Sequence, residues 1–471
     1  MRFSAALTAE RLLPRQLAAK SRPLFERIDA ALFQPGEQAT AGRMSLAAFV
    51  IRIISAVIAF VSQVLLARWM GGFEYGIFVL VWVTMVIVGN LSCLGVHTSV
   101  VRYVPEYLEK HKLAELRGIL LASRIFGFVV STFFAVLGAV GIWLLAPSLE
   151  SYYLLPFYLG VICIPMIALS DVLQGIARAN GWVMTALTPT YLIRPVLILV
   201  CMLGALQLGY PACAETAVIA TIVATYATTL IQLSSIASRA ENLIPPGPRK
   251  YEPKIWMAVS IPIFLVEGFF FLLTNADVLM VGWFMPPDDV AVYFATVKTL
   301  AVVHFVYFAV KAGVAQRYSH YAHAGDRAGL AAFARETATW TFWPSLLIGV
   351  AVLLVGEFLL SLFGDGFVAG YPLLFVLVAG VVARSSVGPA ESVLTMSGNQ
   401  NICAVVFAVA LAINVGLNFI LIPMFGLWGA AIATALAVVF EALALAAIVW
   451  QRLGIVMPVF LPARSAAEDA V

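Results

Sequence analysis

The segment "DVLMVGWF" (277–284) closes an apolar run that begins at Ile255, and it holds an acid, Asp277, inside a stretch that a lipid bilayer would otherwise accept. A run of this length can cross a hydrocarbon core of about 30 Å as a helix. A similar segment, "QVLLARWM" (63–70), lies 214 residues earlier, with Gln63 in the place of Asp277. The two copies predict a membrane protein built from two related halves.

The composition excludes a soluble protein. Of the 471 residues, 62% are hydrophobic and 11% are charged, against about 25% charged residues in an average soluble domain. Apolar segments of roughly 20 residues recur along the chain, each long enough for a transmembrane helix. We therefore predict an all-α polytopic membrane protein with about 12 transmembrane helices in two six-helix lobes. The predicted spans are residues 44–67, 75–97, 119–146, 152–174, 186–207, 213–237, 255–283, 290–314, 338–364, 370–394, 401–423 and 427–450.

Lysine and arginine collect in every second connection between these spans. The cations are Arg102, Lys110, Lys112 and Arg117 after the second span, Arg239, Arg249, Lys250 and Lys254 after the sixth, and Arg317, Arg327 and Arg335 after the eighth. The intervening connections are acidic or neutral, and Arg68 is their only cation. Basic connections stay on the cytoplasmic side of a membrane, so both termini are predicted to be cytoplasmic.

Further matches extend the internal repeat. "EYGIF" (74–78) matches "DVAVY" (289–293), and "VRYVPEY" (101–107) matches "QRYSHY" (316–321), both at a step of 215 residues. Two sets of six spans in the same orientation predict lobes that rock about a site between them. The predicted domains are a basic N-terminal tail (1–43), an N-lobe (44–238), a proline-rich linker (239–254), a C-lobe (255–451) and a C-terminal tail (452–471). The N-terminal tail fits either a solvated segment or a helix lying on the membrane.

Three segments carry a family resemblance: residues 76–120, beginning "GIFVLVWVTMVIVGN", residues 275–300, beginning "NADVLMVGWFMPP", and residues 397–445, with the pattern "N…LN…LIP…G..GAA.AT". In this order and register they resemble the bacterial polysaccharide flippases, the O-antigen and exopolysaccharide translocases of the multidrug, oligosaccharidyl-lipid and polysaccharide exporter superfamily. The resemblance implies a V-shaped helical bundle around a central cavity. It also implies transport of a sugar linked to polyprenyl pyrophosphate across the bacterial inner membrane by alternating access.

Four cations lie inside predicted spans, where a charge is costly and usually faces a lumen or a functional site. Arg52 and Arg194 each lie eight residues inside the cytoplasmic end of a span, which is ~12 Å from that surface. Arg384 lies near mid-depth, and Lys298 lies eight residues from the outer end of its span. This stagger suits a path for an anion, and arginine can hold pyrophosphate with two hydrogen bonds. The four are therefore candidate substrate-binding residues, with local neutralisation between helices as the alternative.

Asp277 and Lys298 are expected to pair. They lie ~9 Å and ~12 Å below the same surface, on helices joined by the short turn "MPPDD", and pairing would offset the desolvation of both charges. The alternative for Asp277 is a coupling role, in which it binds a proton or Na⁺ during transport. Glu267, deeper in the same span, is an equal candidate for that role. No other cofactor is predicted, and the sequence leaves Na⁺ and H⁺ open.

The sequence has no metal-ligand cluster, phosphate-binding glycine loop or nucleophile elbow, so an enzyme is not predicted. Membrane orientation and anionic lipid account for the basic segments, so nucleic acid is not predicted as a partner. The leading hypothesis is a flippase for a lipid-linked oligosaccharide in lipopolysaccharide or exopolysaccharide synthesis, with membrane lipids, and with a polysaccharide polymerase and glycosyltransferases as candidate partners. The alternatives are a cation-coupled multidrug exporter on the same fold, which the four basic and four acidic deep charges do not exclude, and a non-transporting scaffold of the synthesis complex.

Overall fold

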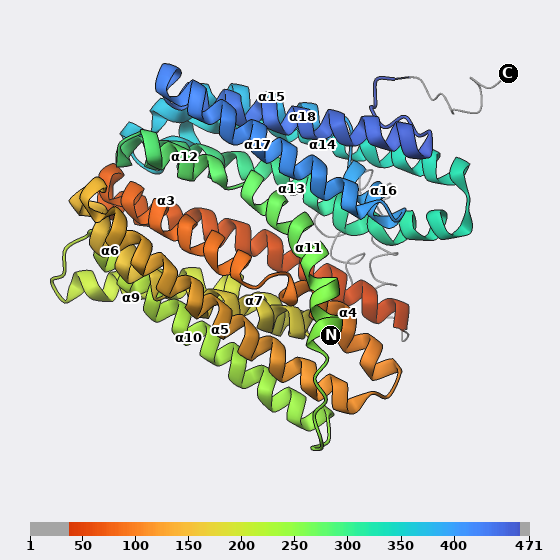
Figure 1. Ribbon diagram of the computed structural model, residues 1–471. Coiled ribbons are helices and arrows are strands. Elements are labelled where there is room, and N and C mark those ends of the chain that lie inside the picture. Colours follow the sequence, from red (N-terminus) through yellow and green to blue (C-terminus); the bar gives the residue numbers. More distant parts are fainter. Residues whose placement is uncertain (1–36, 462–471) are drawn as a thin grey trace, which may run out of the picture.

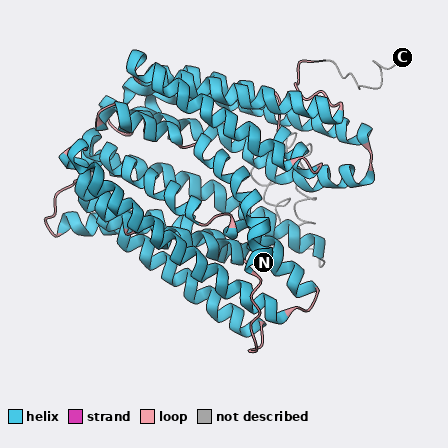
Figure 2. Ribbon diagram, viewed as in Figure 1, coloured by secondary structure: helices cyan, strands magenta, loops and turns pink. Residues whose placement is uncertain are grey.

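The computed structural model describes residues 37–461. The predicted tails at 1–43 and 452–471 lie outside these residues up to position 36 and from position 462. Every regular element between residues 37 and 461 is a helix (Figures 1 and 2). This confirms the predicted all-α class.

The described helices fall into two consecutive sets. The first set is α3 (Glu37–Ser92), α4 (Val96–Glu109), α5 (Leu113–Leu145), η1 (Ala146–Ser148), α6 (Ser151–Val161), α7 (Ile164–Ala179), α8 (Val183–Thr188), η2 (Pro189–Ile193), α9 (Arg194–Gln207) and α10 (Ala214–Leu243). The second set is α11 (Pro253–Leu273), α12 (Ala276–Phe284), α13 (Pro287–Ala324), α14 (Arg327–Ser361), η3 (Asp365–Gly370), α15 (Tyr371–Ser385), α16 (Ala390–Met396), α17 (Gln400–Phe425) and α18 (Leu427–Leu453).

The helices long and apolar enough to cross a membrane match the predicted spans. Ten such helices occur in the described residues, and α6 and α7, bent by 42° at their junction, form an eleventh span. Helix α3 contains two spans, because its backbone leaves helical geometry at Gly71, where φ is 75° and ψ is 172°. Glycine adopts this conformation without the steric cost that a side chain would add. The ten helices, the bent pair and the two halves of α3 together correspond to the twelve predicted spans.

The two sets of helices form two groups that lie side by side (Figure 1). In the N-lobe, α5 and α4 pack on α7, and α9 packs on α10. In the C-lobe, α17 packs on α18 and α13 packs on α14. The lobes meet mainly where α3 lies along α13, and one buried apolar cluster runs through both lobes at this contact. The arrangement is consistent with the predicted two-lobed architecture.

Helix α11 bridges the lobes. Its first half is bonded to α4 of the N-lobe: Trp256 Nε1 donates to the Tyr107 hydroxyl at 2.9 Å, and Ser260 Oγ donates to Ser99 Oγ at 2.7 Å. Its second half packs on α17 of the C-lobe, where the rings of Phe270 and Phe407 have centroids 5.3 Å apart. The chain therefore passes from one lobe to the other within this helix.

The linker before α11 lies on α5. The guanidinium of Arg117 donates to the carbonyl oxygens of Pro245 and Pro248 at 2.8 and 3.1 Å. The Lys250 ammonium lies 2.8 Å from Glu252 and 3.0 Å from Glu115, and these hydrogen bonds raise the pKa of Lys250 to about 12. The predicted linker is thus held against the N-lobe, which leaves α11 as the element that must accommodate relative motion of the lobes.

Candidate functional site: the lobe interface and the charges behind it

The lobes are in close contact at the end of the bundle where α3 turns, called here the Gly71 end. The Tyr75 ring, which is fully buried, has centroid distances of 6.3 Å to Phe294 and 6.1 Å to Phe367 of the C-lobe. Gly76 lies so close to Pro287 that an added Cβ would be 1.8 Å from the Pro287 carbonyl oxygen. Aromatic rings and a backbone contact therefore close the interface at this end.

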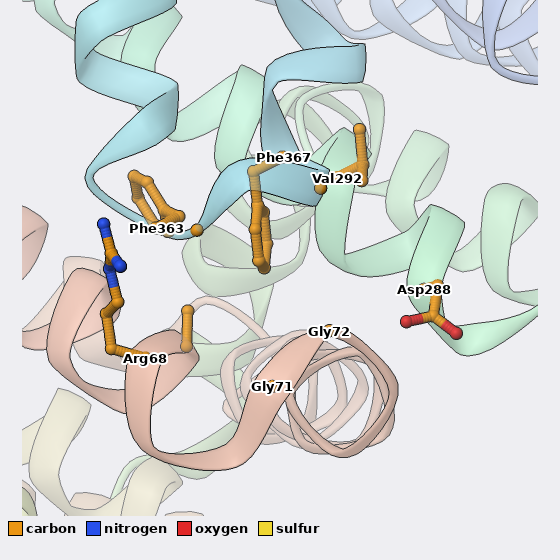
Figure 3. A pocket seen from close by; sticks show the side chains of 10 residues that line it. Arg68, Gly71, Gly72, Asp288, Val292, Phe363 and Phe367 are labelled. Atoms are coloured by element: carbon orange, nitrogen blue, oxygen red, sulfur yellow. The ribbon is translucent and has the colours of Figure 1, made fainter.

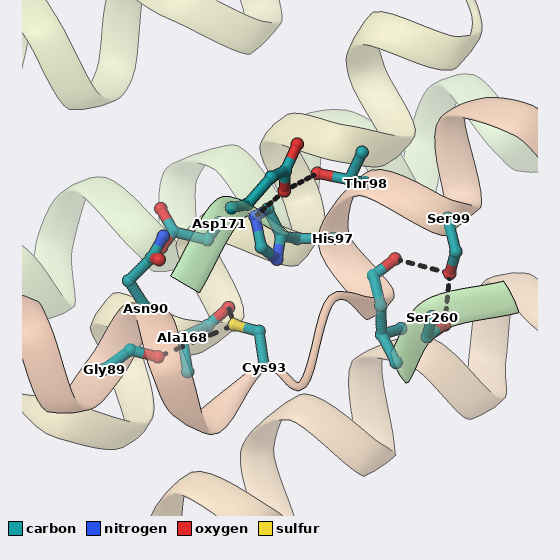
Figure 4. A network of polar contacts seen from close by, with 11 residues as sticks. Gly89, Asn90, Cys93, His97, Thr98, Ser99, Ala168, Asp171 and Ser260 are labelled. Carbon is teal, nitrogen blue, oxygen red and sulfur yellow. Dashed lines mark hydrogen bonds and ion pairs between the residues drawn. The ribbon is translucent and has the colours of Figure 1, made fainter. Parts of the chain in front are cut away.

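Farther along the interface, the contact between α11 and α4 is polar (Figure 4). Thr98 Oγ1 donates to Glu267 Oε2 at 2.8 Å, and His97 Nε2 lies 3.6 Å from the same oxygen. The Glu267 side chain is 47% exposed. Glu267, one of the predicted coupling residues, is thus an accessible acid in a contact between the lobes.

A buried ion pair lies inside the C-lobe. Nη2 of Arg384 donates to Oε1 of Glu441 at 3.0 Å, and both side chains are at most 5% exposed. The Arg384 guanidinium also lies 4.3 Å from the centroid of the Tyr307 ring, a favourable cation–π distance. Burial of both charges is tolerated because each partner neutralises the other. Glu441 Oε2 has no hydrogen-bond partner and remains an available acceptor.

A second ion pair adjoins the first through Tyr307. The Tyr307 hydroxyl donates to Oε2 of Glu391, and Nζ of Lys311 lies 3.0 Å from Oε1 of the same carboxylate. Glu391 is 5% exposed. Because the Tyr307 ring stacks on Arg384 while its hydroxyl bonds Glu391, the two pairs form one charged network across α13, α15, α16 and α18.

A small cavity of ≈60 Å³ lies beside this network, lined by Asp277, His304, Arg384, Thr434 and Glu441 among others. Between residues 37 and 461, no three His, Cys, Asp or Glu side chains converge as a metal site would require. The cavity offers two carboxylates, one of which is already bound to Arg384. This donor set can exchange protons, and a fixed guanidinium in the wall disfavours a second cation.

The expected pair of Asp277 and Lys298 does not form, so that prediction was wrong. Oδ2 of Asp277 accepts a hydrogen bond from the Tyr293 hydroxyl at 2.9 Å, and Oδ1 accepts one from the Val278 amide at 2.9 Å. Lys298 is exposed, and its ammonium lies 4.6 Å from the centroid of the Phe294 ring. Helical geometry explains the outcome, because five residues from Tyr293 to Lys298 turn the helix by ~140°. Tyr293 faces Asp277, and Lys298 projects elsewhere.

In the N-lobe, Arg194 is 7% exposed and lies against α7, where Nη2 donates to Ser170 Oγ at 3.0 Å. Its Nε has no hydrogen-bond partner, and Arg194 forms no ion pair within the described part of the chain. Ser170 also donates to Gln232 Oε1 at 3.2 Å, and Asn90 donates to the neighbouring Asp171 at 3.1 Å. The N-lobe thus carries a buried cation in a neutral, hydroxyl- and amide-rich setting.

The six predicted site residues are therefore separated by the structure into two kinds of position. Arg52 and Lys298 are exposed, and Glu267 is partly so. Arg194, Asp277 and Arg384 are buried inside a lobe. Arg52 and Arg194 share a depth in the sequence, but only Arg52 presents an accessible side chain.

Several polar residues of these networks were not among the predicted site residues: Tyr293, Tyr307, Glu391, Glu441 and Lys311. Tyr293 had a signal in the sequence, because it ends "DVAVY", the copy of "EYGIF" in which Tyr75 stands. Tyr75 donates to Gln63, the counterpart of Asp277, at 2.8 Å. The other four come together from distant helices, which residue spacing does not reveal.

Comparison with known proteins identifies the family. A family model described as polysaccharide biosynthesis protein matches residues 42–315, more than half of the chain. A second model, MatE, matches residues 262–420. No curated protein matched the chain.

Solved structures share the fold at low sequence identity. An inward-facing multidrug resistance MATE family transporter of the MOP superfamily has a TM-score of 0.70 and 14% identity, covering 87% of this chain and 98% of that one. The lipid II flippase MurJ in an inward closed conformation has a TM-score of 0.65 and 15% identity, covering 86% and 87%. A MOP superfamily transporter from Pyrococcus furiosus, described as having a binding pocket of reverse polarity, has a TM-score of 0.61 and 14% identity, covering 90% and 97%. This chain therefore belongs to the polysaccharide biosynthesis protein family and is a multi-pass membrane protein with the fold of the MOP superfamily transporters.

Proposed function

We propose that this protein is a flippase that moves an oligosaccharide linked to polyprenyl pyrophosphate across the bacterial inner membrane by alternating access. The observation that carries the proposal is the match of the polysaccharide biosynthesis family to the N-lobe and the first two spans of the C-lobe. The similar fold of a structure described as a lipid II flippase supports a lipid-linked cargo. The product would serve lipopolysaccharide or exopolysaccharide synthesis.

The orientation in the membrane follows from the distribution of cations. The Gly71 end carries the acidic connections and faces the periplasm, and the end that holds α4 and the linker faces the cytoplasm with both termini. The contacts of Tyr75 and Gly76 then close the periplasmic side. A cargo made in the cytoplasm would enter from the other side.

The accessible cations are the residues proposed to contact the cargo. Arg52 and Lys298 are exposed on α3 and α13, the helices along which the lobes meet. The planar guanidinium of Arg52 can bind a pyrophosphate with two hydrogen bonds. Arg194 and Arg384 lie behind these helices, and we propose that they add positive charge to the anion path from within the lobes. Arg194 has the larger effect in this proposal, because Glu441 neutralises Arg384.

The coupling of transport to an ion is proposed to involve Glu267 and Asp277. Glu267 is accessible and lies between α11 and α4, so a bound proton or Na⁺ would weaken a contact between the lobes. Asp277 begins α12, directly after the break that ends α11, and lines the C-lobe cavity. A change in its charge would alter the position of α12 relative to α13 through Tyr293.

A cation-coupled multidrug exporter is the second candidate. The MatE match over residues 262–420 and the MATE transporter folds favour it. An exporter of cationic drugs would present accessible acids to its cargo, whereas the accessible charges on α3 and α13 include Arg52 and Lys298. The exposed cations therefore favour an anionic cargo.

The test is deletion of the gene and complementation at matched protein abundance. The flippase proposal predicts loss of surface polysaccharide and accumulation of its lipid-linked precursor on the cytoplasmic face, both restored by the intact chain. Drug susceptibility measured in the same strains is the control, because an exporter would change susceptibility and leave the polymer intact. Co-purification of a polymerase or glycosyltransferase with the tagged protein would identify the proposed partners.

A further inference from the structure

Arg68 is the only lysine or arginine in the connections that face the periplasm. Basic residues are disfavoured on that side of an inner-membrane protein, so its presence calls for a specific contact. Nothing in the proposed cargo path uses it. We propose that Arg68 is a latch that holds the two lobes together on the periplasmic side.

The contacts of Arg68 cross the interface between the lobes (Figure 3). Nε donates to the carbonyl oxygen of Leu362, and Nη2 donates to the carbonyl oxygen of Ser361, both at 2.6 Å. Arg68 belongs to α3 of the N-lobe, whereas Ser361 and Leu362 are the last residue and the C-cap of α14 in the C-lobe. Separation of the lobes at this end therefore breaks both hydrogen bonds.

The acceptors are suited to a cation with a fork geometry. The last carbonyl groups of a helix lack intrahelical donors and carry the negative end of the helix dipole. A guanidinium presents two parallel N–H groups and satisfies two such carbonyls at once, which an ammonium cannot do. The bond to α14 thus accounts for arginine at this position.

The latch lies beside the aromatic contacts that close this end. Arg68 lines a cavity of ≈360 Å³ together with Gly71, Asp288, Phe363 and Phe367, and Phe363 packs edge-on against Phe60 with centroids 5.4 Å apart. The Arg68 side chain is exposed. Water can replace the carbonyl acceptors when the lobes part, so the contact is reversible in a way that a buried ion pair would not be.

This inference rests on the alternating-access function proposed above, but its test needs no cargo. Ala291 is fully buried and lies one helical turn beyond Pro287, on the face of α13 that meets the N-lobe. Ala291→Cys serves as a reporter, labelled from the periplasm by a membrane-impermeant maleimide in intact cells and quantified by mass spectrometry. We expect Arg68→Ala to raise the labelling rate of Ala291→Cys roughly tenfold, a shift of about 1.4 kcal/mol toward the open state. Arg68→Lys, which keeps the charge and loses the fork, should give an intermediate rate.

Matched controls separate the latch from general damage. Glu74→Gln alters a charge at the same end, but Glu74 accepts from the Ala214 amide at 2.8 Å within the N-lobe, so labelling should stay at the parent rate. The native Cys163 and Cys403 are buried and should remain unlabelled in every folded variant.

Three results would overturn the latch: equal labelling in Arg68→Ala and its parent, a rise in Glu74→Gln as large as that in Arg68→Ala, or a rise that occurs only with labelling of Cys163 and Cys403. If Arg68→Ala does not fold, an unchanged rate in Arg68→Lys would overturn it in the same way. In each case the proposed cargo would stand or fall separately on the polymer and precursor measurements.

Discussion

The hydroxyl group of Tyr293 donates a hydrogen bond to Oδ2 of Asp277 at 2.9 Å, and in the other lobe the hydroxyl group of Tyr75 donates to Oε1 of Gln63 at 2.8 Å. Gln63 and Asp277 are the matched positions of the internal repeat. In each lobe, a polar side chain near the end of one helix is thus held by a tyrosine of the helix that follows. The repeat is present as a contact as well as a sequence match.

Tyr293→Phe should destabilise the protein. The substitution leaves Oδ2 of Asp277 without its donor in a site where the side chain is 3% exposed, and a buried polar group without its partner costs ~1–3 kcal/mol. Thermal unfolding in detergent measures the loss. Asp277→Asn in the Tyr293→Phe background should recover part of it, because a neutral amide is cheaper to bury than a carboxylate. Unchanged unfolding of Tyr293→Phe would contradict the role given to this bond.

Lys298→Gln should not rescue Asp277→Asn, because Lys298 contacts Phe294 and does not pair with Asp277. The comparison is between the unfolding temperatures of the two single variants and the double variant. We expect additive effects, as for independent sites. A double variant more stable than Asp277→Asn alone would restore the ion pair that the sequence suggested.

Glu441→Ala should strongly destabilise the C-lobe. It leaves the Arg384 guanidinium buried without its carboxylate, and removing one partner of a buried pair typically costs 3–5 kcal/mol, here ~3 or more. Replacing both partners with apolar residues, Arg384→Met with Glu441→Leu, should recover most of the stability. Glu106→Ala is the control, because its pair with Lys110 is exposed at the surface and such pairs contribute ~0–1 kcal/mol. Equal losses in the two alanine variants would argue against a buried pair.

Arg52 and Arg194 should respond differently to substitution. Arg52 is exposed, so Arg52→Ala should abolish surface polysaccharide while protein abundance stays normal, and Arg52→Lys should impair transport because the fork is lost. Arg194 packs on Ser170 inside the N-lobe, so Arg194→Ala should also lower abundance or thermal stability. Polymer, lipid-linked precursor and protein level are measured in the same cells. Normal polymer in Arg52→Ala cells would remove Arg52 from the cargo path.

Gly76→Ala should weaken closure of the periplasmic end. An added Cβ would lie 1.8 Å from the Pro287 carbonyl oxygen, so the lobes must move apart to accept it. Faster labelling of Ala291→Cys from the periplasm is the expected result. Gly141→Ala is the matched control, because Gly141 also lies in a helix of the N-lobe but has open space where the Cβ would be. Labelling that rises equally in both variants would contradict the proposed seal.

The sequence alone determined the class of protein, the twelve spans and the internal repeat. Hydrophobic length and the placement of Lys and Arg depend only on neighbouring residues and on the solvent, since each span must satisfy its own backbone in lipid. The turn between the first two spans was predicted within residues 68–74, and Gly71 forms it. The resemblance of three segments also indicated the family that the comparison identified.

Tertiary structure alone decided the partners of the buried charges. Depth along a helix places Asp277 and Lys298 at a common level, but the angular position around the helix, and not depth, selects Tyr293. The network of Arg384, Glu441, Tyr307 and Glu391 joins four helices whose packing angles no local pattern specifies. The role of Arg68 was likewise hidden, because its acceptors are backbone carbonyls 293 and 294 residues away. Carbonyl groups are the same at every residue, so only the packing of α3 against the end of α14 shows which of them Arg68 binds.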